Sequence, residues 1–285
     1  MPRYDRLFER RRADGVVIPF LMAGDPSIGA TMAAVEALVA AGADALELGI
    51  PFSDPVADGP VIQRAAVRAL EAGAMPARCM ELVAAVRASY PNLPIGLLVY
   101  ANLVARRGIA EFYRAVSAAG ADSVLIPDVP GVEVRPFAHA ARAAGVDPVF
   151  IIPPAAGDDV IARAAAFGGG YTYVQGRPGV TGAATPMARP DASLIRRIDA
   201  AGAPPSVVGF GVSTRRHLED ALAAGARGVI AGSAVVAIVE RSAGDQPRMR
   251  AELRAFMEGL RPPSAGASAP SPALTVSAMH PAITR

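Results

Sequence analysis

The chain repeats one local pattern, in which a helical segment ends in Ala-Gly and a short apolar run follows at once. The pattern occurs at Ala41-Gly42, Ala119-Gly120, Ala144-Gly145, Ala201-Gly202 and Ala224-Gly225. Glycine just past a helix end adopts the left-handed conformation that closes the helix at little cost. Successive copies are spaced by the length of chain that one strand and one helix need. The repeat therefore predicts a fold built from β–α units.

The apolar runs are continuous in Val, Ile and Leu, which is typical of strands covered on both faces, as in parallel sheets. They predict eight strands, near 16–22, 45–50, 95–100, 122–127, 148–152, 171–175, 206–210 and 228–231. Helical segments separate them, for example Ala30–Ala41, Met80–Ser89, Ile109–Ala119, Asp158–Ala166 and Arg215–Ala224. Eight alternating units predict a single-domain (β/α)8 TIM barrel. An open doubly wound sheet is the alternative, but no G-x-G-x-x-G motif follows the first strand.

We expect the catalytic barrel to span residues 1–260. Residues 261–285 are dominated by Pro, Ser and Ala, which predicts a disordered tail. The N-terminus lacks the apolar core of a secretory signal, and the longest apolar runs are too short to cross a bilayer. A cytoplasmic protein without a membrane segment is the resulting expectation.

All 28 basic residues are arginine, and the chain contains no lysine. This excludes Schiff-base lysine catalysis and the phosphate-binding lysine of a P-loop. The 26 acidic residues leave a net charge of +2, which gives no electrostatic reason to expect a nucleic acid or an anionic membrane as partner. One cysteine and three scattered histidines cannot form a Cys/His zinc site, so no metal and no cofactor are expected.

Glu47 lies inside an otherwise apolar predicted strand, ALELGI. Side chains alternate along a strand, so Leu46 and Leu48 face one way and Glu47 the other. If the leucines meet the helix layer, Glu47 points into the barrel mouth. A buried carboxylate is costly unless it is paired or neutralised, so function is a natural reason for it. The structural alternative is a glutamate neutralised by an arginine.

The loop after this strand, PFSDPVADGP, contains Asp54 and Asp58. Aspartate flanked by Pro and Gly usually shapes a turn, and for Asp58 alone that interpretation is the stronger one. Chemistry in a barrel is found at the C-terminal strand ends. The position of Asp58 one loop beyond Glu47 therefore makes the two residues a candidate catalytic pair.

Glycine-rich segments follow the last two predicted strands, GFGVS at 209–213 and AGSA at 231–234. Glycine lets backbone N–H groups approach an oxyanion, and a helix N-terminus adds a favourable dipole. Barrels commonly bind phosphate with these two loops. We expect a phosphate site here, which FMN would also fit. The alternative is that Gly232-Ser233 only caps the last helix.

The loop after the sixth strand, GRPGVTGAATPM, is long and rich in Gly and Pro. Such a loop suits a mobile lid over a reaction that must exclude water. A plain disordered connection is the alternative.

Eight segments together resemble the alpha chain of tryptophan synthase. They are PFLMAGDPS, LELGIPFSDPVADGPVIQRA, GLLVYAN, SVLIPDVP, YTYV, GVTGA, GFGVST and AGSAVV, in the family's order over about residues 5–260. The segment around Glu47 and Asp58 is the most specific. The resemblance implies a lyase of tryptophan biosynthesis that cleaves indole-3-glycerol phosphate to indole and glyceraldehyde 3-phosphate in a retro-aldol reaction. It also implies a partner beta chain in an alpha2beta2 tetramer.

By the resemblance, Glu47 matches the general acid–base that protonates indole C3 and takes the proton from the glycerol hydroxyl. Asp58 matches the carboxylate that accepts from the indole N–H. A retro-aldol cleavage needs an electron sink, and without lysine or a metal site that sink is the substrate's own ring. We expect a raised pKa for Glu47, which suits proton transfer near neutral pH.

The remaining matches concern substrate binding. The family's indole pocket matches Phe20, Leu98, Tyr100, Leu125, Ile151, Tyr173, Phe210 and Ile230. Each of these is also credible as an ordinary core residue. The phosphate contacts match Gly182, Gly211, Gly232 and Ser233, and Thr181 matches the lid threonine that orders the closed lid near the catalytic Asp.

The chain departs from the family pattern at a few positions. Gln175-Gly176 stands where the family usually has Leu-Ser, and Pro178 stiffens the lid. Pro127 replaces a smaller residue at the end of the fourth strand. Ala105-Arg106-Arg107 replaces an aromatic and Asn stretch that in the family lies against the beta chain.

Three other functions remain open on the sequence. A free-standing lyase that releases indole would use the same residues without a partner. A non-catalytic barrel could serve as an allosteric partner of a beta chain, although retention of both Glu47 and Asp58 argues against it. Another phosphate-binding barrel, such as an isomerase or a flavin enzyme, is the last alternative.

Overall fold

The structure is a computed structural model that describes residues 1–176 and 189–261 of the chain. Within the described residues, eight parallel strands close into a barrel in chain order, with β1 paired to both β2 and β8. The strands are β1 (Val16–Met22), β2 (Leu46–Gly49), β3 (Ile95–Leu98), β4 (Ser123–Leu125), β5 (Asp147–Ile152), β6 (Thr172–Gln175), β7 (Ser206–Gly209) and β8 (Gly228–Ala231). The expected TIM barrel is confirmed, and the open-sheet alternative is wrong.

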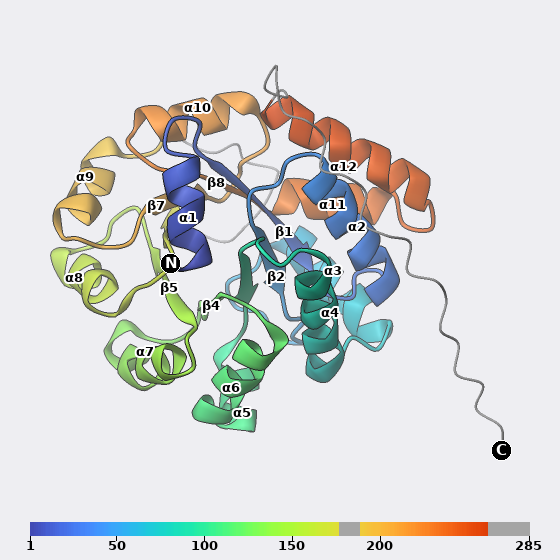
Figure 1. The fold of residues 1–285 in the computed structure, drawn as a ribbon, viewed down its shortest axis with the longest axis horizontal. Helices are drawn as coiled ribbons and strands as arrows, with labels where there is room; N and C mark the ends of the chain where they lie inside the picture. Colours follow the sequence, from blue (N-terminus) through green and yellow to red (C-terminus); the bar gives the residue numbers. More distant parts are fainter. Residues whose placement is uncertain (177–188, 262–285) are drawn as a thin grey trace.

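Helices surround the barrel (Figure 1). They are α1 (Arg3–Arg10), α2 (Ile28–Ala40), α3 (Pro60–Glu71), α4 (Pro76–Ser89), α5 (Ala101–Arg107), α6 (Ile109–Ala119), α7 (Val134–Ala143), α8 (Asp158–Phe167), α9 (Ala192–Ala200), α10 (Arg215–Ala223), α11 (Ser233–Arg241) and α12 (Gln246–Leu260), with one 3-10 turn, η1 (Gly131–Glu133). Of the helices that the structure describes, none combines the length and the apolar character that a bilayer crossing would need.

The predicted bounds of the strands and helices agree with the structure to within two residues, except at the start of one helix. The third strand ends at Leu98 instead of residue 100 because Tyr100 already precedes the first turn of α5. The fourth strand shortens to Ser123–Leu125, and Pro127 beyond it has no backbone N–H to donate to a ladder. The helix predicted from Met80 begins at Pro76, since proline is well suited to a first helical turn.

The barrel interior is filled by side chains that alternate inward along the strands. One buried cluster unites Val16, Ile18, Ala45, Leu125, Val149, Tyr171, Tyr173, Val207, Phe210 and Ile230 with Tyr4, Leu7 and Phe8 of α1. Leu46 and Leu48 belong instead to the larger cluster beneath the outer helices. The two clusters give the fold its layers, an inner core and a ring between strands and helices.

Helix α1 closes the amino-terminal end of the barrel and lies over the barrel's centre in Figure 1. Its Arg3 pairs with Asp122 at 2.7 Å, and the Tyr4 and Ser123 hydroxyls lie 3.0 Å apart at the start of β4. This end is therefore filled by protein side chains, which leaves the carboxyl-terminal end for a ligand.

An arginine links the loop after β1 to two helices. Arg68 of α3 donates two hydrogen bonds of 2.8 Å to the buried carboxylate of Asp25 and one of 2.7 Å to Glu240 of α11. A bidentate arginine–carboxylate pair fixes both distance and orientation. The contact holds the last turn of α3 against the loop after β1 and against α11.

The last described helix, α12, packs on α2, where Arg250 pairs with Glu36 at 2.6 Å. Arg261 after it pairs with Asp44 at 2.8 Å. Residues 262–285 lie outside the described residues, so the division into a 1–260 barrel and a 261–285 tail stays a prediction.

Candidate active site

Glu47 lies in the middle of β2 with its side chain toward the barrel axis. Its neighbours Leu46 and Leu48 pack under the helices, as strand alternation requires. The Glu47 side chain is buried, and the Tyr171 hydroxyl donates a hydrogen bond of 2.7 Å to its Oε1. None of the described arginines pairs with Glu47, so the structural ion pair considered from the sequence is absent among them.

Burial raises the pKa of Glu47 from its ordinary 4.5 to about 7, and the Tyr171 hydrogen bond opposes part of this rise. The charge of Asp58 raises the Glu47 pKa further, though less than burial does. A carboxyl group that is half protonated near neutral pH can both donate and accept a proton. This is the property that a single acid–base group needs.

Asp58 lies in the loop between β2 and α3 and is also buried. The Tyr100 hydroxyl donates a hydrogen bond of 2.9 Å to its Oδ2, and the same hydroxyl accepts one of 3.2 Å from the Ala57 N–H. Gln63 donates a hydrogen bond of 2.7 Å to the Asp58 carbonyl, which fixes the loop backbone. Burial raises the pKa of Asp58 to about 6.

The two carboxyl groups lie near enough for their charges to act on each other and on a common neighbour. Besides the effect of Asp58 on Glu47, the charges of both groups raise the pKa of Tyr173, a buried inner residue of β6. Tyr173 lies in the cluster that fills the barrel, and its ring meets Phe210 edge to face at a centroid distance of 5.8 Å. Glu47, Asp58 and Tyr173 therefore belong to one region of the barrel interior.

The apolar residues proposed for the indole pocket fall into three groups. Leu125, Tyr173, Phe210 and Ile230 lie in the inner barrel cluster, and Leu98 and Ile151 pack against it. Phe20 of β1 pairs in register with Glu47 of β2 and belongs to the outer cluster. Its ring occupies the space that a side chain on Gly49 would need. Tyr100 differs from the rest because its hydroxyl holds Asp58.

Close approach to Tyr173 depends on a glycine. A Cβ on Gly209 of β7 would collide with the Tyr173 hydroxyl and ring. Only a residue without a side chain lets this tyrosine reach across the barrel. Gly209 is therefore part of what places Tyr173 beside the two acids.

The loops after β7 and β8 have the backbone form expected of an anion site. Phe210 has φ of 73° and Gly211 has φ of 84°, both in the left-handed region. For Phe210 this conformation is strained, and such strain is concentrated at functional sites. Gly232 precedes α11, whose first residue is the buried Ser233. The amide groups of both loops lie at the carboxyl-terminal end of the barrel, where a phosphate would be bound.

Several expected site residues lie elsewhere. Thr181 and Gly182, together with Pro178 and most of the expected lid, fall in residues 177–188, outside the described residues. Gln175 ends β6 and is half-buried, opposite Gly209. Arg106 and Arg107 are exposed at the end of α5. In the part of the chain that the structure describes, no three His, Cys, Asp or Glu side chains are grouped to hold a metal ion.

Sequence reasoning missed Tyr171, the direct partner of Glu47. A signal was present, because Tyr171 and Tyr173 are two residues apart in the predicted strand 171–175, where alternation places them on one face. It also missed the contact from the Ser213 N–H to His217 Nδ1, at 3.1 Å, which ties the loop after β7 to α10. Strand and helix periodicity predicts neither contact, because Glu47 and Tyr171 lie far apart in the chain and Ser213 lies in a loop.

Comparisons with known proteins identify the family that this chain is similar to. A family model described as tryptophan synthase alpha chain matches residues 8–262. The chain is 48% identical to the tryptophan synthase alpha chain of Shewanella amazonensis over 263 residues, which is 92% of this chain and 99% of that relative.

Two solved structures have the same fold. The tryptophan synthase structure from Mycobacterium tuberculosis matches with a TM-score of 0.80 and 31% identity, over 91% of this chain and 98% of that one. The tryptophan synthase a2b2 complex of Pyrococcus furiosus matches with a TM-score of 0.76 and 33% identity, over 87% and 97% of the two chains.

Proposed function

The chain belongs to the tryptophan synthase alpha chain family, and we propose that Glu47 and Asp58 are the two acids with which it cleaves its substrate. As a member of this family it is a carbon–carbon lyase subunit, which converts indole-3-glycerol phosphate to indole and glyceraldehyde 3-phosphate. The observation that supports the two residues most strongly is that both are buried within reach of each other's charge, each with a raised pKa and each held by one tyrosine hydroxyl.

The reaction begins with Glu47 in its protonated form. Glu47 donates its proton to C3 of the indole ring, so the ring nitrogen acquires positive charge. The resulting carboxylate takes the proton from the hydroxyl on the adjacent glycerol carbon. The carbon–carbon bond then breaks, its electron pair returns to the ring, and the hydroxyl carbon becomes the aldehyde carbonyl. Glu47 is protonated again at the end, so one group with a pKa of about 7 serves both steps.

Asp58 acts in its ionised form. Its carboxylate accepts a hydrogen bond from the indole N–H, where positive charge develops when C3 is protonated. An oriented charge in a buried site stabilises such a charge far better than water does. The Tyr100 hydroxyl and the Ala57 N–H hold the carboxylate in place before substrate arrives. This pre-organisation avoids a reorganisation cost during the reaction.

The substrate lies across the barrel mouth in this proposal. Its ring lies among Phe20, Leu98, Leu125, Ile151, Tyr173, Phe210 and Ile230. The backbone amides of Gly211, Gly232 and Ser233 bind the phosphate, with the dipole of α11 adding attraction. Gly182 and Thr181, which fall outside the described residues, would complete the phosphate contacts and the lid. No lysine is available, so amides and hydroxyls carry this interaction.

The partner of the chain is a tryptophan synthase beta chain. The matching structure from Pyrococcus furiosus is an a2b2 complex, described by the mutual activation of its subunits. The same assembly for this chain predicts slow cleavage by the isolated chain and faster cleavage with a beta chain. We also propose that this assembly works in the cytoplasm, on the ground of the family's biosynthetic role. Cell fractionation tests that location.

Indole release from indole-3-glycerol phosphate, with and without a beta chain, tests the assignment. Glu47→Gln and Asp58→Asn should each remove nearly all lyase rate, because one loses the proton and the other the charge. Asp54→Asn is the matched control, an exposed aspartate in the same loop, and should leave the rate unchanged. An active Glu47→Gln variant would refute the proposed acid. High activity that no beta chain increases would favour a free-standing lyase.

A further inference from the structure

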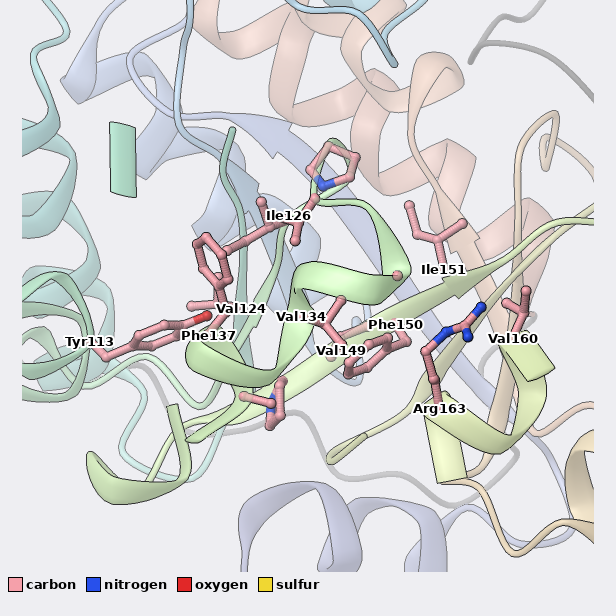
Figure 2. A pocket seen from close by; sticks show the side chains of 15 residues that line it. Tyr113, Val124, Ile126, Val134, Phe137, Val149, Phe150, Ile151, Val160 and Arg163 are labelled. Carbon is pink, nitrogen blue, oxygen red and sulfur yellow. The ribbon is translucent and has the colours of Figure 1, made fainter. Parts of the chain in front are cut away.

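A cavity lies in the layer between the barrel and the outer helices. It has a volume of about 190 Å³ and is enclosed by α6, α7 and the first turns of α8 on one side and by β4 and β5 on the other. Figure 2 shows its lining side chains, which are mostly apolar and include Ile126, Phe137 and Phe150. Neither Glu47 nor Asp58 lines it.

Short elements explain why the space is open. β4 has three residues, and after Leu125 the chain leaves the sheet through Pro127 toward η1. The facing helix α7 presents the small side chain of Ala138. Protein interiors normally leave few voids larger than a water molecule. An apolar cavity of about 150 Å³ in another protein holds benzene, so this one is large enough for a single ring with a short substituent.

Tyr113 of α6 marks one end of the cavity. The residue is 1% exposed, but its hydroxyl keeps accessible surface in the cavity and has no hydrogen-bond partner among the described residues. The hydroxyls of Tyr4, Tyr100 and Tyr171 bond to side chains of this chain, whereas the hydroxyl of Tyr113 is left for a molecule in the cavity. Burial raises the pKa of Tyr113, so the hydroxyl stays protonated and can donate. An acceptor atom inside the cavity would complete it.

Arg163 of α8 marks the other end, and Figure 2 shows the Tyr113 hydroxyl and the Arg163 guanidinium on opposite sides of the pocket. One guanidinium nitrogen of Arg163, Nη2, donates to Asp159 at 2.6 Å. The guanidinium also lies against Gly131, where a Cβ would come within 2.9 Å of Nε. The glycine thus leaves room for arginine at the mouth, and the planar guanidinium suits a carboxylate.

We propose that this cavity binds an aryl-alkanoic acid whose ring carries a hydroxyl or carbonyl oxygen. The carboxylate meets Arg163 at the mouth, the ring and the alkyl spacer fill the apolar interior, and the ring oxygen accepts a hydrogen bond from Tyr113. The cavity shares Ile151 with the proposed indole pocket, but neither acid lines it, and the inference does not depend on the roles of Glu47 and Asp58.

The test titrates the full chain with 3-(4-hydroxyphenyl)propionate and follows backbone amide shifts by NMR. Two truncated probes accompany it, 3-phenylpropionate without the ring oxygen and 4-ethylphenol without the carboxylate. We expect saturable one-to-one binding of the full probe, with shift changes concentrated in α7 and in the strands that line the cavity. Each truncated probe should bind several-fold more weakly.

Two variants test whether Tyr113 binds the ring oxygen of the probe and Arg163 its carboxylate. Tyr113→Phe should weaken the full probe about threefold to tenfold and leave 3-phenylpropionate unchanged, since only the hydrogen bond is lost. Arg163→Met should weaken both acids and leave 4-ethylphenol unchanged. Tyr113→Phe should also fold normally, because its hydroxyl has no partner to lose. Arg114→Met is the control, an exposed arginine of α6 outside the cavity, and should change nothing.

Three results would overturn the proposal. The first is an absence of saturable binding. The second is shift changes confined to residues around Glu47, which would place the probe in the lyase site. The third is a Tyr113→Phe variant that binds all three probes like the parent chain, which would mean that an ordered water satisfies the hydroxyl.

Discussion

The hydroxyl of Tyr171 donates a 2.7 Å hydrogen bond to Oε1 of Glu47, and both groups are buried in the barrel interior. The bond links the residue just before β6 to β2. It orients the carboxyl group and also lowers its pKa, against the larger upward effect of burial. Tyr171 is thus a positioning residue for the proposed acid.

Replacement of this tyrosine should alter both rate and pH dependence. In Tyr171→Phe the Glu47 carboxyl loses a donor, so its pKa rises above the present value of about 7. We expect kcat to fall about fivefold to tenfold and the basic limb of the pH–rate profile to move to higher pH. Steady-state kinetics between pH 5 and 9 measure both. Tyr90→Phe, outside the barrel, serves as the control, and an unmoved basic limb would contradict the role of Tyr171.

The parent chain should itself show a narrow pH optimum. Catalysis needs Asp58 ionised, which requires pH above about 6, and Glu47 protonated, which requires pH below about 7. We therefore expect a bell-shaped profile of kcat/KM, whose limbs belong to the coupled pair rather than to one residue. A rate that rises steadily up to pH 9 would be incompatible with a protonated Glu47.

Glu47 should reduce the stability of the fold at neutral and alkaline pH. Its folded-state pKa of about 7 exceeds the ordinary 4.5, so the unfolded chain binds fewer protons between these values and stability falls as pH rises through that range. Glu47→Gln should raise the free energy of unfolding by about 1–3 kcal/mol at pH 8 and by much less at pH 5. Urea unfolding at both pH values measures this. An equal gain at both would show that charge is not the cause.

Gly209 should not tolerate a methyl group. In Gly209→Ala the new Cβ occupies the place of the Tyr173 ring, so the tyrosine must move from its position beside the acids. We expect a loss of about 1–3 kcal/mol in stability and a clear fall in kcat. Gly29→Ala is the matched control, because a Cβ there meets nothing within 4 Å. A Gly209→Ala chain with parental stability and activity would contradict the packing described.

Arg68 should matter far more than its neighbour Arg64. Arg68→Met leaves the buried Asp25 without its bidentate partner, at a cost of about 3 kcal/mol. Arg64→Met removes only a solvent-screened surface contact to Glu240, so its cost should be much smaller. Thermal unfolding of the two variants compares them directly. Similar losses would show that Asp25 finds another partner.

The barrel and the inward orientation of Glu47 could both be predicted from the chain. Helix ends at Ala-Gly and continuous apolar runs are local signals, and the alternation of side chains along a strand is a geometric rule with a period of two. The role of Asp58 was harder to predict, because a turn aspartate next to Pro and Gly has the same local sequence pattern as a catalytic one.

The strand ends were the weakest part of the fold prediction. Apolar character continues through Val99 and Ile126, and the Val99 N–H still donates to the Leu125 carbonyl at 3.0 Å, but the regular strands end at Leu98 and Leu125. Tyr100 illustrates this, since it begins a helix and turns its hydroxyl toward Asp58.

The sequence alone determined the order of strands and helices, the face on which each strand side chain lies and the family, because these depend on neighbours along the chain. Only the tertiary structure decided which hydroxyl meets which acid, as in Tyr171 with Glu47, and how much water each carboxyl group loses. Closing the barrel brings residues from distant strands within hydrogen-bond distance, and the burial that follows moves the pKa values to where the chemistry needs them.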